Sequence, residues 1–199
     1  MTHPAAILLA AGRSSRMGAF KPLLPVGDQS MIQRLVQTMR RSGADPILVV
    51  TGHRHAELEA HLSDYGLVFI HNLQYAQTHM LDSILLGLSR LPDNCERVLL
   101  SPSDLPLVRP ETVTALLRSP GDFVRPCYQG RGGHPVLLSR TLLPVLNQYQ
   151  GPDGLAGALR FAGIRPTDIP VSDPGIHLSC NTPEEYAALL RHFHEQEDH

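Results

Sequence analysis

Apolar runs of strand length alternate along the chain with longer segments in which apolar residues recur every three or four positions. This alternation predicts βα units around a mostly parallel sheet. The expected strands are residues 5–10, 46–52, 67–72, 97–104, 121–128, 134–139 and 165–171. The expected helices are residues 30–43, 55–66, 80–91, 110–119, 140–148, 155–162 and 182–193. Residues 123–138 depart from strict alternation, so we expect one antiparallel or inserted strand there.

Length and charge limit the classes of protein to consider. A chain of 199 residues can bury one sizeable core, so a single α/β domain over residues 1–199 is expected. The 17 basic and 19 acidic residues give a net charge of -2, which provides no global basic field for nucleic acid or an anionic membrane. No apolar run reaches the roughly 18 to 20 residues of a membrane span, and the start of the chain has no cleavable signal pattern. We therefore expect a cytoplasmic protein whose anion binding, if any, is local.

Cysteine and histidine add little to this picture. The three cysteines are widely spaced and form no CxxC pair, which argues against a disulfide framework or a zinc site. Histidine is frequent, but the C-terminal stretch RHFHEQEDH is polar and is expected to be a solvated end of the chain rather than a metal site.

The stretch AILLAAGRSSRMGAFKPLLPVG joins a buried strand to a loop of small and basic residues. Ligands of parallel α/β sheets bind at the carboxyl ends of the strands. Ala11 and Gly12 allow the backbone to pass close to a ligand and to direct N–H groups at an anion. Arg13, Arg16 and Lys21 add positive charge for several phosphate groups. The loop fits neither GxxxxGK[ST] nor GxGxxG, so we expect a different polyphosphate site, the alternative being a solvated turn.

A carboxylate follows another expected strand, in RVLLSPSDLPLVRP. Asp104 lies at the carboxyl end of this strand, and neighbouring prolines restrict the loop around it. Magnesium usually takes one or two protein oxygens together with phosphates and waters, so Asp104 is a candidate ligand. The alternative is an aspartate that only caps a helix or a turn.

These residues carry a family resemblance. LLAAGRSSRMGAFKPLLPVG resembles the LAAGxSxRMGxxKxLLP loop of nucleotidyltransferases, and within them that of the molybdenum-cofactor cytidylyltransferases and guanylyltransferases. The likeness continues through VVTGHR, IHNLQYAQTHMLDSILLGL, LLSPSDLPLV, GRGGHPVLLS and NTPEEY, in order over nearly the whole chain. It implies a three-layer α/β/α, Rossmann-like fold of the nucleotide-diphospho-sugar transferase type, with a mostly parallel mixed sheet. It also implies a nucleotide-binding half, residues 1–110, and an acceptor-binding half, residues 111–199.

The resemblance assigns roles residue by residue. It implies a nucleotide site of Leu9, Ala10, Ala11, Gly12, Arg13, Arg16, Lys21, Thr51, Gly52, Ser83, Gly87 and Asp104. Within this set it implies catalysis by Arg16, Lys21 and Asp104. It further implies Mg²⁺ as cofactor, with Asp104 and Asn181 as ligands. The implied acceptor site consists of Gly133, His134, Asp153 and Gly154.

Most of these roles have a structural alternative in the sequence itself. Ser83 could be a tolerated mid-helix serine, and Gly52 could be only a turn before an exposed His53 and Arg54. The glycines of GRGGHP are fully explained by a turn, and Asp153 could cap the following helix.

The chain also departs from the family pattern at three positions. Ser103 stands where relatives often have glycine, and Ser179 and Asn181 stand where a DxDTPED pattern has carboxylates. Guanylyl relatives carry asparagine at the place of Asn181, and an asparagine carbonyl still binds a hard cation. The methyl group of Ala11, where guanylyl relatives usually have glycine, favours a smaller pyrimidine, and TGHR resembles the cytidylyl type.

The region before the last helix also has a purely structural interpretation. Asn181 then only precedes a helix in which Thr182 is the N-cap, Pro183 the first helical residue and Glu185 the partner in a capping box. The two interpretations are compatible.

The leading hypothesis is transfer of CMP from CTP to the phosphate of a molybdopterin-type cofactor, with release of pyrophosphate. The first alternative is a GTP-dependent molybdenum cofactor guanylyltransferase or a nucleotidyltransferase for another small phosphate. The second is a degenerate protein that binds nucleotide or cofactor without turnover, with a molybdoenzyme or chaperone as its partner.

Overall fold

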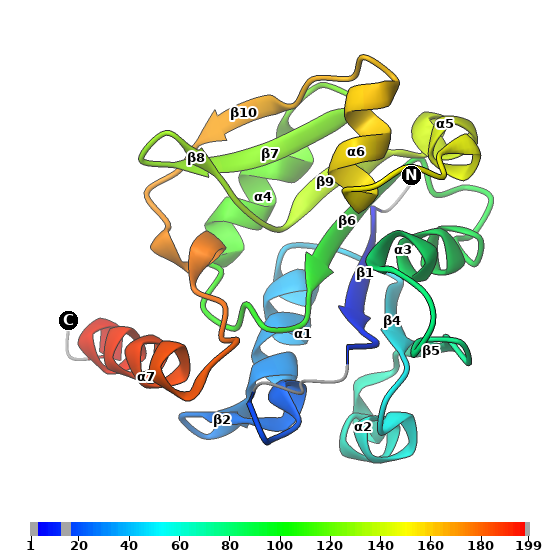
Figure 1. Ribbon diagram of the computed structural model, residues 1–199. Helices are drawn as coiled ribbons and strands as arrows, with labels where there is room; N and C mark the ends of the chain where they lie inside the picture. The colour runs from blue at the N-terminus through cyan, green and yellow to red at the C-terminus, as the bar shows by residue number, and fades with distance from the viewer. Residues whose placement is uncertain (1–3, 13–16, 198–199) are drawn as a thin grey trace.

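The computed structural model describes residues 4–12 and 17–197, so Arg13 and Arg16 lie outside the described residues (Figure 1). The helices are α1 (Met31–Arg41), α2 (His55–His61), α3 (Met80–Leu88), α4 (Pro110–Arg118), α5 (Leu143–Gln148), α6 (Gly154–Phe161) and α7 (Pro183–Glu197). The strands are β1 (Ala5–Ala10), β2 (Pro25–Val26), β3 (Gln29–Ser30), β4 (Ile47–Thr51), β5 (Val68–His71), β6 (Arg97–Pro102), β7 (Phe123–Tyr128), β8 (Arg131–Gly132), β9 (Val136–Ser139) and β10 (Thr167–Pro170).

The main sheet is mixed and mostly parallel, as predicted. Its order is β10-β7-β9-β6-β1-β4-β5, with β8 paired to β7. Strand β1 pairs in parallel with both β4 and β6, and β4 pairs in parallel with β5. Strand β9 is antiparallel to β6 and to β7, which confirms the expected irregular strand near residues 123–138. The carboxyl ends of β1, β4, β5 and β6 therefore meet at one edge of the sheet.

Alternate side chains of the central strand enter two cores, which makes the fold three-layered. Ala6, Leu8 and Ala10 of β1 pack with side chains of α1, α2 and α4 on one face. Ala5 and Ile7 pack with side chains of α3, α5 and α6 on the other face. A buried strand that alternates between two helical layers needs apolar residues at every position, which explains the uninterrupted apolar run.

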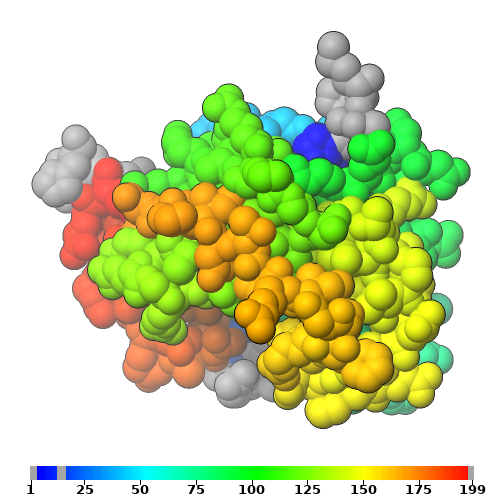
Figure 2. Space-filling view, turned by 90° about the horizontal axis from the view of Figure 1, so that it is seen from above, coloured from blue at the N-terminus to red at the C-terminus, as the bar shows by residue number. Residues whose placement is uncertain are grey.

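The surface over one end of the sheet comes from the second half of the chain. In Figure 2, α5 and α6 in yellow lie beside the orange segment that carries β10. Both core clusters nevertheless draw residues from either side of residue 110. None of the described helices is long and apolar enough to cross a membrane.

The capping chemistry of α1 shows how the sequence sets one helix start. The Ser30 hydroxyl accepts a hydrogen bond from Gln33 N, and the Gln33 side chain accepts one from Ser30 N at 2.8 Å. This reciprocal pair is a capping box, and it begins the helix where the sequence predicts it.

Several elements are shorter than expected. Helix α2 ends at His61 and is followed by a 3₁₀ turn, Ser63–Tyr65, instead of reaching residue 66. Strand β6 ends at Pro102, which has no N–H to continue the ladder. The short hairpin of β2 and β3 was not expected, because two-residue strands have no detectable period. This hairpin and α7, which lie near each other in Figure 1, bury a small third cluster that includes Val26, Leu189 and Phe193.

Candidate functional site

A cavity of about 390 Å³ lies at the carboxyl edge of the sheet. It is formed by the loops that follow β1 and β6 and by the segment that connects β5 to α3. Among the residues assigned from the sequence, the structure places in its lining Leu9, Ala10, Ala11, Gly12, Lys21, Ser83, Asp104 and Asn181. Residues from four distant parts of the chain therefore meet at the place where this architecture holds ligands.

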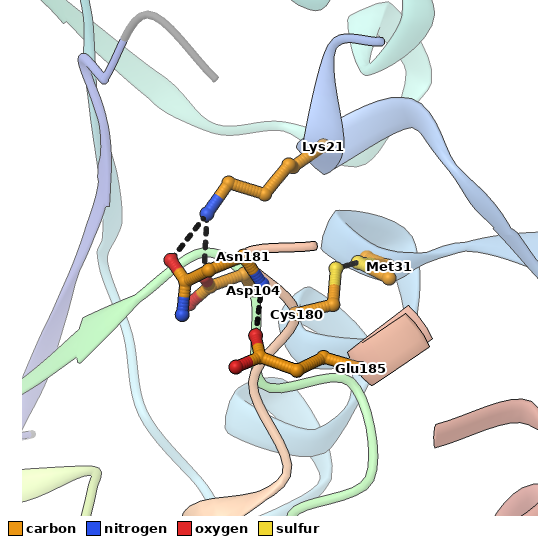
Figure 3. Close-up of polar contacts among 6 residues, drawn as sticks. All are labelled: Lys21, Met31, Asp104, Cys180, Asn181 and Glu185. Carbon is orange, nitrogen blue, oxygen red and sulfur yellow. Dashed lines mark hydrogen bonds and ion pairs between the residues drawn. The ribbon is translucent and has the colours of Figure 1, made fainter. Parts of the chain in front are cut away.

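Three polar side chains converge in this cavity (Figure 3). The Lys21 ammonium donates to Asp104 Oδ2 at 3.1 Å and to Asn181 Oδ1 at 3.0 Å. The Lys21 and Asp104 side chains are only 17% and 15% exposed, so water weakens their attraction less than at an open surface. One ammonium group and two side-chain oxygens that could bind a metal ion therefore lie together.

The side-chain oxygens of Asp104 and Asn181 are suited to binding a divalent cation. The Asp104 carboxylate and the Asn181 carbonyl already converge on one positive charge, that of Lys21. Hard oxygen donors of this kind are what Mg²⁺ takes, usually with phosphates and waters completing its shell.

The loop that carries Lys21 is anchored by its neighbour. Phe20 is buried, and Lys21 begins the 3₁₀ helix Lys21–Leu23 directly after it. The His53 ring meets the Phe20 ring edge-on at 6.2 Å between centroids, and the Arg54 guanidinium lies 5.2 Å from the centre of the same ring. The TGHR stretch thus packs against the lysine loop, and this packing positions Lys21.

The segment before α7 positions Asn181. The Asn181 N–H donates to Glu185 Oε2 at 2.5 Å (Figure 3). The Glu185 N–H donates to Thr182 Oγ1 at 3.3 Å. The expected capping box is thus present with one difference, because the Glu185 carboxylate reaches the N–H of Asn181 and not that of Thr182. Next to it Cys180 is buried against Met31, and burial raises the pKa of the Cys180 thiol to about 11.

Ser103, one of the departures from the family pattern, is part of the cavity wall. Its N–H donates to the carbonyl of Leu9 at 3.1 Å, which fastens the loop after β6 to the end of β1. The serine is buried, and it lines the cavity beside Asp104. Its backbone therefore holds the Asp104 loop close to the loop after β1.

Ser83 is held by a residue that the sequence analysis did not single out. Asn72, the first residue after β5, donates from its amide to Ser83 Oγ at 3.0 Å and to Thr78 Oγ1 at 2.9 Å. Asn72 Oδ1 also accepts from Gln74 N–H at 3.0 Å. This network fixes the segment between β5 and α3 along one side of the cavity.

Three residues assigned to the nucleotide site lie outside the cavity lining. A methyl group on Gly87 would come within 3.0 Å of Ile7 and 3.1 Å of Val50, so this glycine lets α3 approach the sheet. Gly52 is enclosed by Tyr75 and the backbone of Ala11. Thr51 is buried at the end of β4. Their place in the structure is behind the cavity wall.

A second cavity, of about 1070 Å³, adjoins the first. All four residues assigned to the acceptor lie along it, namely Gly133, His134, Asp153 and Gly154. Both cavities share a wall made of Leu9, His79, Met80 and Pro102. The two sets of site residues are therefore brought next to each other, and each cavity draws on both halves of the chain.

The backbone holds His134 and Gly133 in place. Gly133 N–H donates to the Pro126 carbonyl at 2.9 Å, and His134 N–H donates to the Ile176 carbonyl at 3.2 Å. Burial lowers the pKa of His134, so its imidazole is neutral at pH 7. It can then give or take one hydrogen bond without adding charge to the cavity.

Asp153 and Arg125 differ in how they face the same cavity. Asp153 directly precedes α6 with a left-handed backbone, φ 69°, and its side chain makes no capping hydrogen bond to that helix. It pairs instead with Arg160 at 2.6 Å, with both side chains largely exposed. Arg125, which the sequence analysis missed, lines the cavity and pairs with both oxygens of Asp168 at 2.7 and 2.9 Å. The bond from Arg125 holds the pKa of Asp168 below its usual value.

Sequence reasoning missed further residues that line the first cavity, namely Pro22, Tyr75, Thr78, His79 and Met80. Three of them lie between β5 and α3, and Met80 is the first residue of α3. A signal for them was present, since this segment also follows a strand at the carboxyl edge. The residue types gave no further indication, because they are common in ordinary loops.

The chain is similar over nearly its whole length to several known proteins. The molybdenum cofactor cytidylyltransferase of Escherichia coli (strain K12) is 27% identical over 192 residues, which cover 95% of this chain and 96% of that protein. A solved nucleotidyl transferase from Methanothermobacter has a TM-score of 0.85 and 25% identity, with 98% of this chain and 100% of that chain covered. A manganese complex of Rv0371c from Mycobacterium tuberculosis H37Rv has a TM-score of 0.80 and 23% identity, with 96% and 99% covered.

The family and fold expected from the sequence are confirmed by these likenesses. From these similarities we conclude that this chain is a nucleotidyltransferase and that it has the nucleotide-diphospho-sugar transferase fold. The manganese complex is consistent with the use of a divalent metal in this group of proteins. The family model described as "MobA-like NTP transferase domain" matches residues 6–167, and the chain therefore belongs to this family.

Proposed function

We propose that this nucleotidyltransferase transfers CMP from Mg–CTP to the phosphate of a molybdopterin-type cofactor and releases pyrophosphate. The observation that carries the proposal is the convergence of Lys21, Asp104 and Asn181 in a cavity that adjoins a second, larger one. The first cavity is the nucleotide site and the second is the acceptor site. The E. coli relative, a molybdenum cofactor cytidylyltransferase, supports the choice of substrates.

The nucleotide is bound by the loop after β1 and by Lys21. Ala10, Ala11 and Gly12 line the cavity, so backbone N–H groups of this loop can bind phosphate oxygens. The flexible side chain of Lys21 brings an ammonium to the same cavity. The methyl group of Ala11 narrows the space for the base, which favours cytosine over a purine.

Asp104 and Asn181 would hold Mg²⁺, which when bound supplies positive charge to the triphosphate. A phosphate monoester has a second pKa near 6, so the acceptor is mostly a dianion at neutral pH and needs no general base. One of its oxygens forms a bond to the α-phosphorus, and the bond from that phosphorus to the bridging oxygen breaks. The electron pair of the broken bond leaves with pyrophosphate. Lys21 offsets the negative charge of this transition state, and the two cavities align the reactants.

The acceptor is held in the larger cavity. Arg125 is a cationic side chain on its wall whose Nε and Nη2 pair with Asp168, so a phosphate would bind the guanidinium beside that carboxylate or in its place, and His134 adds one neutral hydrogen-bonding group. Gly133 lets this wall lie close to Ile176, because a methyl group there would meet the Ile176 carbonyl oxygen at 2.7 Å. Asp153 and Gly154 border the same space at the start of α6.

A guanylyltransferase is the second candidate, and one observation favours it. Asn181 takes part in the cation-binding group, and guanylyl relatives carry asparagine at this place. Ala11 opposes this candidate, because its side chain lines the nucleotide cavity where a larger base would need room.

Pyrophosphate release tests the proposal. The purified protein is given Mg²⁺ and molybdopterin cofactor, with CTP, GTP, ATP and UTP in parallel. We expect kcat/KM for CTP to exceed that for GTP by at least about tenfold, the discrimination that about 1.4 kcal/mol provides. The matched variant Ala11→Gly should narrow this ratio. A preference for GTP in the unmodified protein would overturn the assignment of CTP, and CTP binding without pyrophosphate release would overturn the choice of acceptor.

A further inference from the structure

Three metal-binding side chains meet on the surface formed by α2 and β5, away from the two cavities. The cluster consists of His55, Glu59 and His71, and their ligand atoms all lie within 4.8 Å of one another. His71 Nε2 is hydrogen-bonded to Glu59 Oε1, and His55 Nδ1 lies 3.8 Å from the same oxygen. The two imidazole rings lie 4.2 Å apart between centroids. In the part of the chain that the structure describes, this is the one group of three such residues.

The fold itself brings the cluster together. His55 and Glu59 are four residues apart on α2, so their side chains share one face of the helix. His71 is the last residue of β5, the strand at the end of the sheet. The side chains are partly exposed, and His55, His71 and Glu59 have 48%, 35% and 29% of their side-chain surface accessible. Small rotations can therefore adjust the ligand distances.

We propose that His55, Glu59 and His71 bind one divalent transition metal, with Zn²⁺ as the best match to the donors. Two imidazoles and one carboxylate are a recurring zinc set that leaves a fourth position for water. Bonds of about 2.0–2.1 Å in a tetrahedral site require donors about 3.4 Å apart, close to the 3.8 Å between His55 Nδ1 and Glu59 Oε1. This chemistry differs from that of Asp104 and Asn181, whose oxygens suit Mg²⁺.

The local charge is compatible with a cation. The nearest arginine in sequence, Arg54, is occupied by a two-pronged ion pair with Glu57, with contacts of 2.6 and 2.7 Å. Glu59 therefore supplies the negative charge of the cluster.

A metal at this place would join α2 to β5. His71 directly precedes Asn72, whose amide holds Thr78 and Ser83 beside the nucleotide cavity. The metal would thus stabilise the end of β5 from which that segment starts. We expect it to raise the melting temperature without taking part in catalysis.

Equilibrium dialysis of the full chain against ZnCl₂ tests the proposal, with excess Mg²⁺ present to occupy oxygen sites. We expect one equivalent of tightly bound Zn²⁺, and at least a tenfold weaker affinity in His55→Gln and in His71→Gln. The matched control is the double variant His192→Gln and His194→Gln in the C-terminal helix, which should bind like the unmodified protein. Loss of the bound zinc in this control, or equal binding by the α2–β5 variants, would overturn the proposal.

Thermal denaturation gives an independent readout. Zn²⁺ should raise the melting temperature of the unmodified protein and of the double variant in the C-terminal helix. It should not raise the melting temperature of His55→Gln or His71→Gln. The metal-free variants should melt close to the metal-free parent, since the changed side chains are exposed. If a histidine variant fails to fold, Glu59→Gln replaces it, and an undiminished zinc-induced shift in Glu59→Gln would contradict the assignment of the carboxylate. The rate of CTP turnover with Mg²⁺ should be the same in His55→Gln as in the unmodified protein. A failure of the zinc proposal can therefore be told apart from a failure of the proposed function.

Discussion

The ammonium group of Lys21 joins two oxygens that the chain supplies from far-apart positions. Asp104 and Asn181 are 83 and 160 residues away from Lys21 in sequence, and both accept a hydrogen bond from its Nζ. None of the three side chains belongs to the apolar core clusters, and all three line the cavity. Their arrangement is better explained by a ligand that carries both positive and negative charge, such as a metal ion with phosphate groups, than by packing.

Replacing Lys21 therefore should affect turnover more than folding. We expect Lys21→Ala to lower kcat for pyrophosphate release by about 100-fold or more, the usual effect of losing one group that stabilises transition-state charge. The free energy of unfolding should change by about 1 kcal/mol, because the bonds of Lys21 to Asp104 and Asn181 line a cavity where water can replace the lost ammonium. Steady-state kinetics and urea denaturation measure the two effects. Lys21→Arg is the control for charge, and full turnover by Lys21→Ala would contradict the phosphate role.

At the scale of elements, the end of β4 is a crowded junction between the loops that form the nucleotide cavity. A methyl group on Gly52 would lie 2.7 Å from Tyr75 Cβ and 2.8 Å from the Ala11 carbonyl oxygen. One of these atoms is backbone and the other is fixed to it, so neither can move away easily. Gly52 thus allows the loop after β1 and the segment after β5 to lie against each other.

We expect Gly52→Ala to destabilise the protein by about 1–3 kcal/mol, the usual cost of overpacking a filled site. It should also raise KM for the nucleotide, since both displaced residues line the cavity. Thermal and urea denaturation check the first effect, and initial rates check the second. Gly12→Ala is the matched control for stability, because a methyl group there meets nothing within 4 Å. Equal melting temperatures for the two variants would contradict the crowding argument.

The elements that the sequence predicts well are those whose physical signal is local. The run at Ala5–Ala10 is apolar at every position because β1 lies between two helical layers, and Ser30 begins α1 through its own capping box. The hairpin of β2 and β3 has no such signal, since its stability comes from contacts with α7. For the same reason the sequence could not show that Arg125 faces the acceptor cavity, because this depends on how β7 lies beside α6.

In the candidate site, too, some residues can be recognised from the sequence and others cannot. The loop motif and Asp104 are recognisable because charge and small residues stand directly after buried strands. Gly87 and Gly52 carry the same family pattern, yet the structure places them in contacts behind the cavity wall. Arg13 and Arg16 lie outside the described residues, so their role in the nucleotide site stays a prediction.

At the scale of the whole molecule, two adjoining cavities lie along one edge of the sheet, and the proposed function assigns one substrate to each. The proposed nucleotide cavity lies over the ends of β1 and β6, and the proposed acceptor cavity extends toward β7, β9 and α6. Leu9, His79, Met80 and Pro102 belong to both walls, so in this proposal the reacting phosphates meet near these residues. Substitutions deep in one cavity should therefore change the affinity for one substrate and spare the other.

Arg125 provides the test of this separation. Loss of a charge-assisted bond to phosphate is worth about 1.5–3 kcal/mol, so Arg125→Ala should raise KM for the acceptor by about tenfold or more. KM for CTP should change less than about twofold, because Arg125 lines the proposed acceptor cavity and does not line the proposed nucleotide cavity. Asp168→Asn is the matched control, since it removes the carboxylate that pairs with Arg125 but leaves the guanidinium in place. If Asp168→Asn raised the acceptor KM as much as Arg125→Ala, the ion pair would act through structure. If instead only Arg125→Ala did so, the guanidinium binds the acceptor, and the two cavities divide the substrates as proposed.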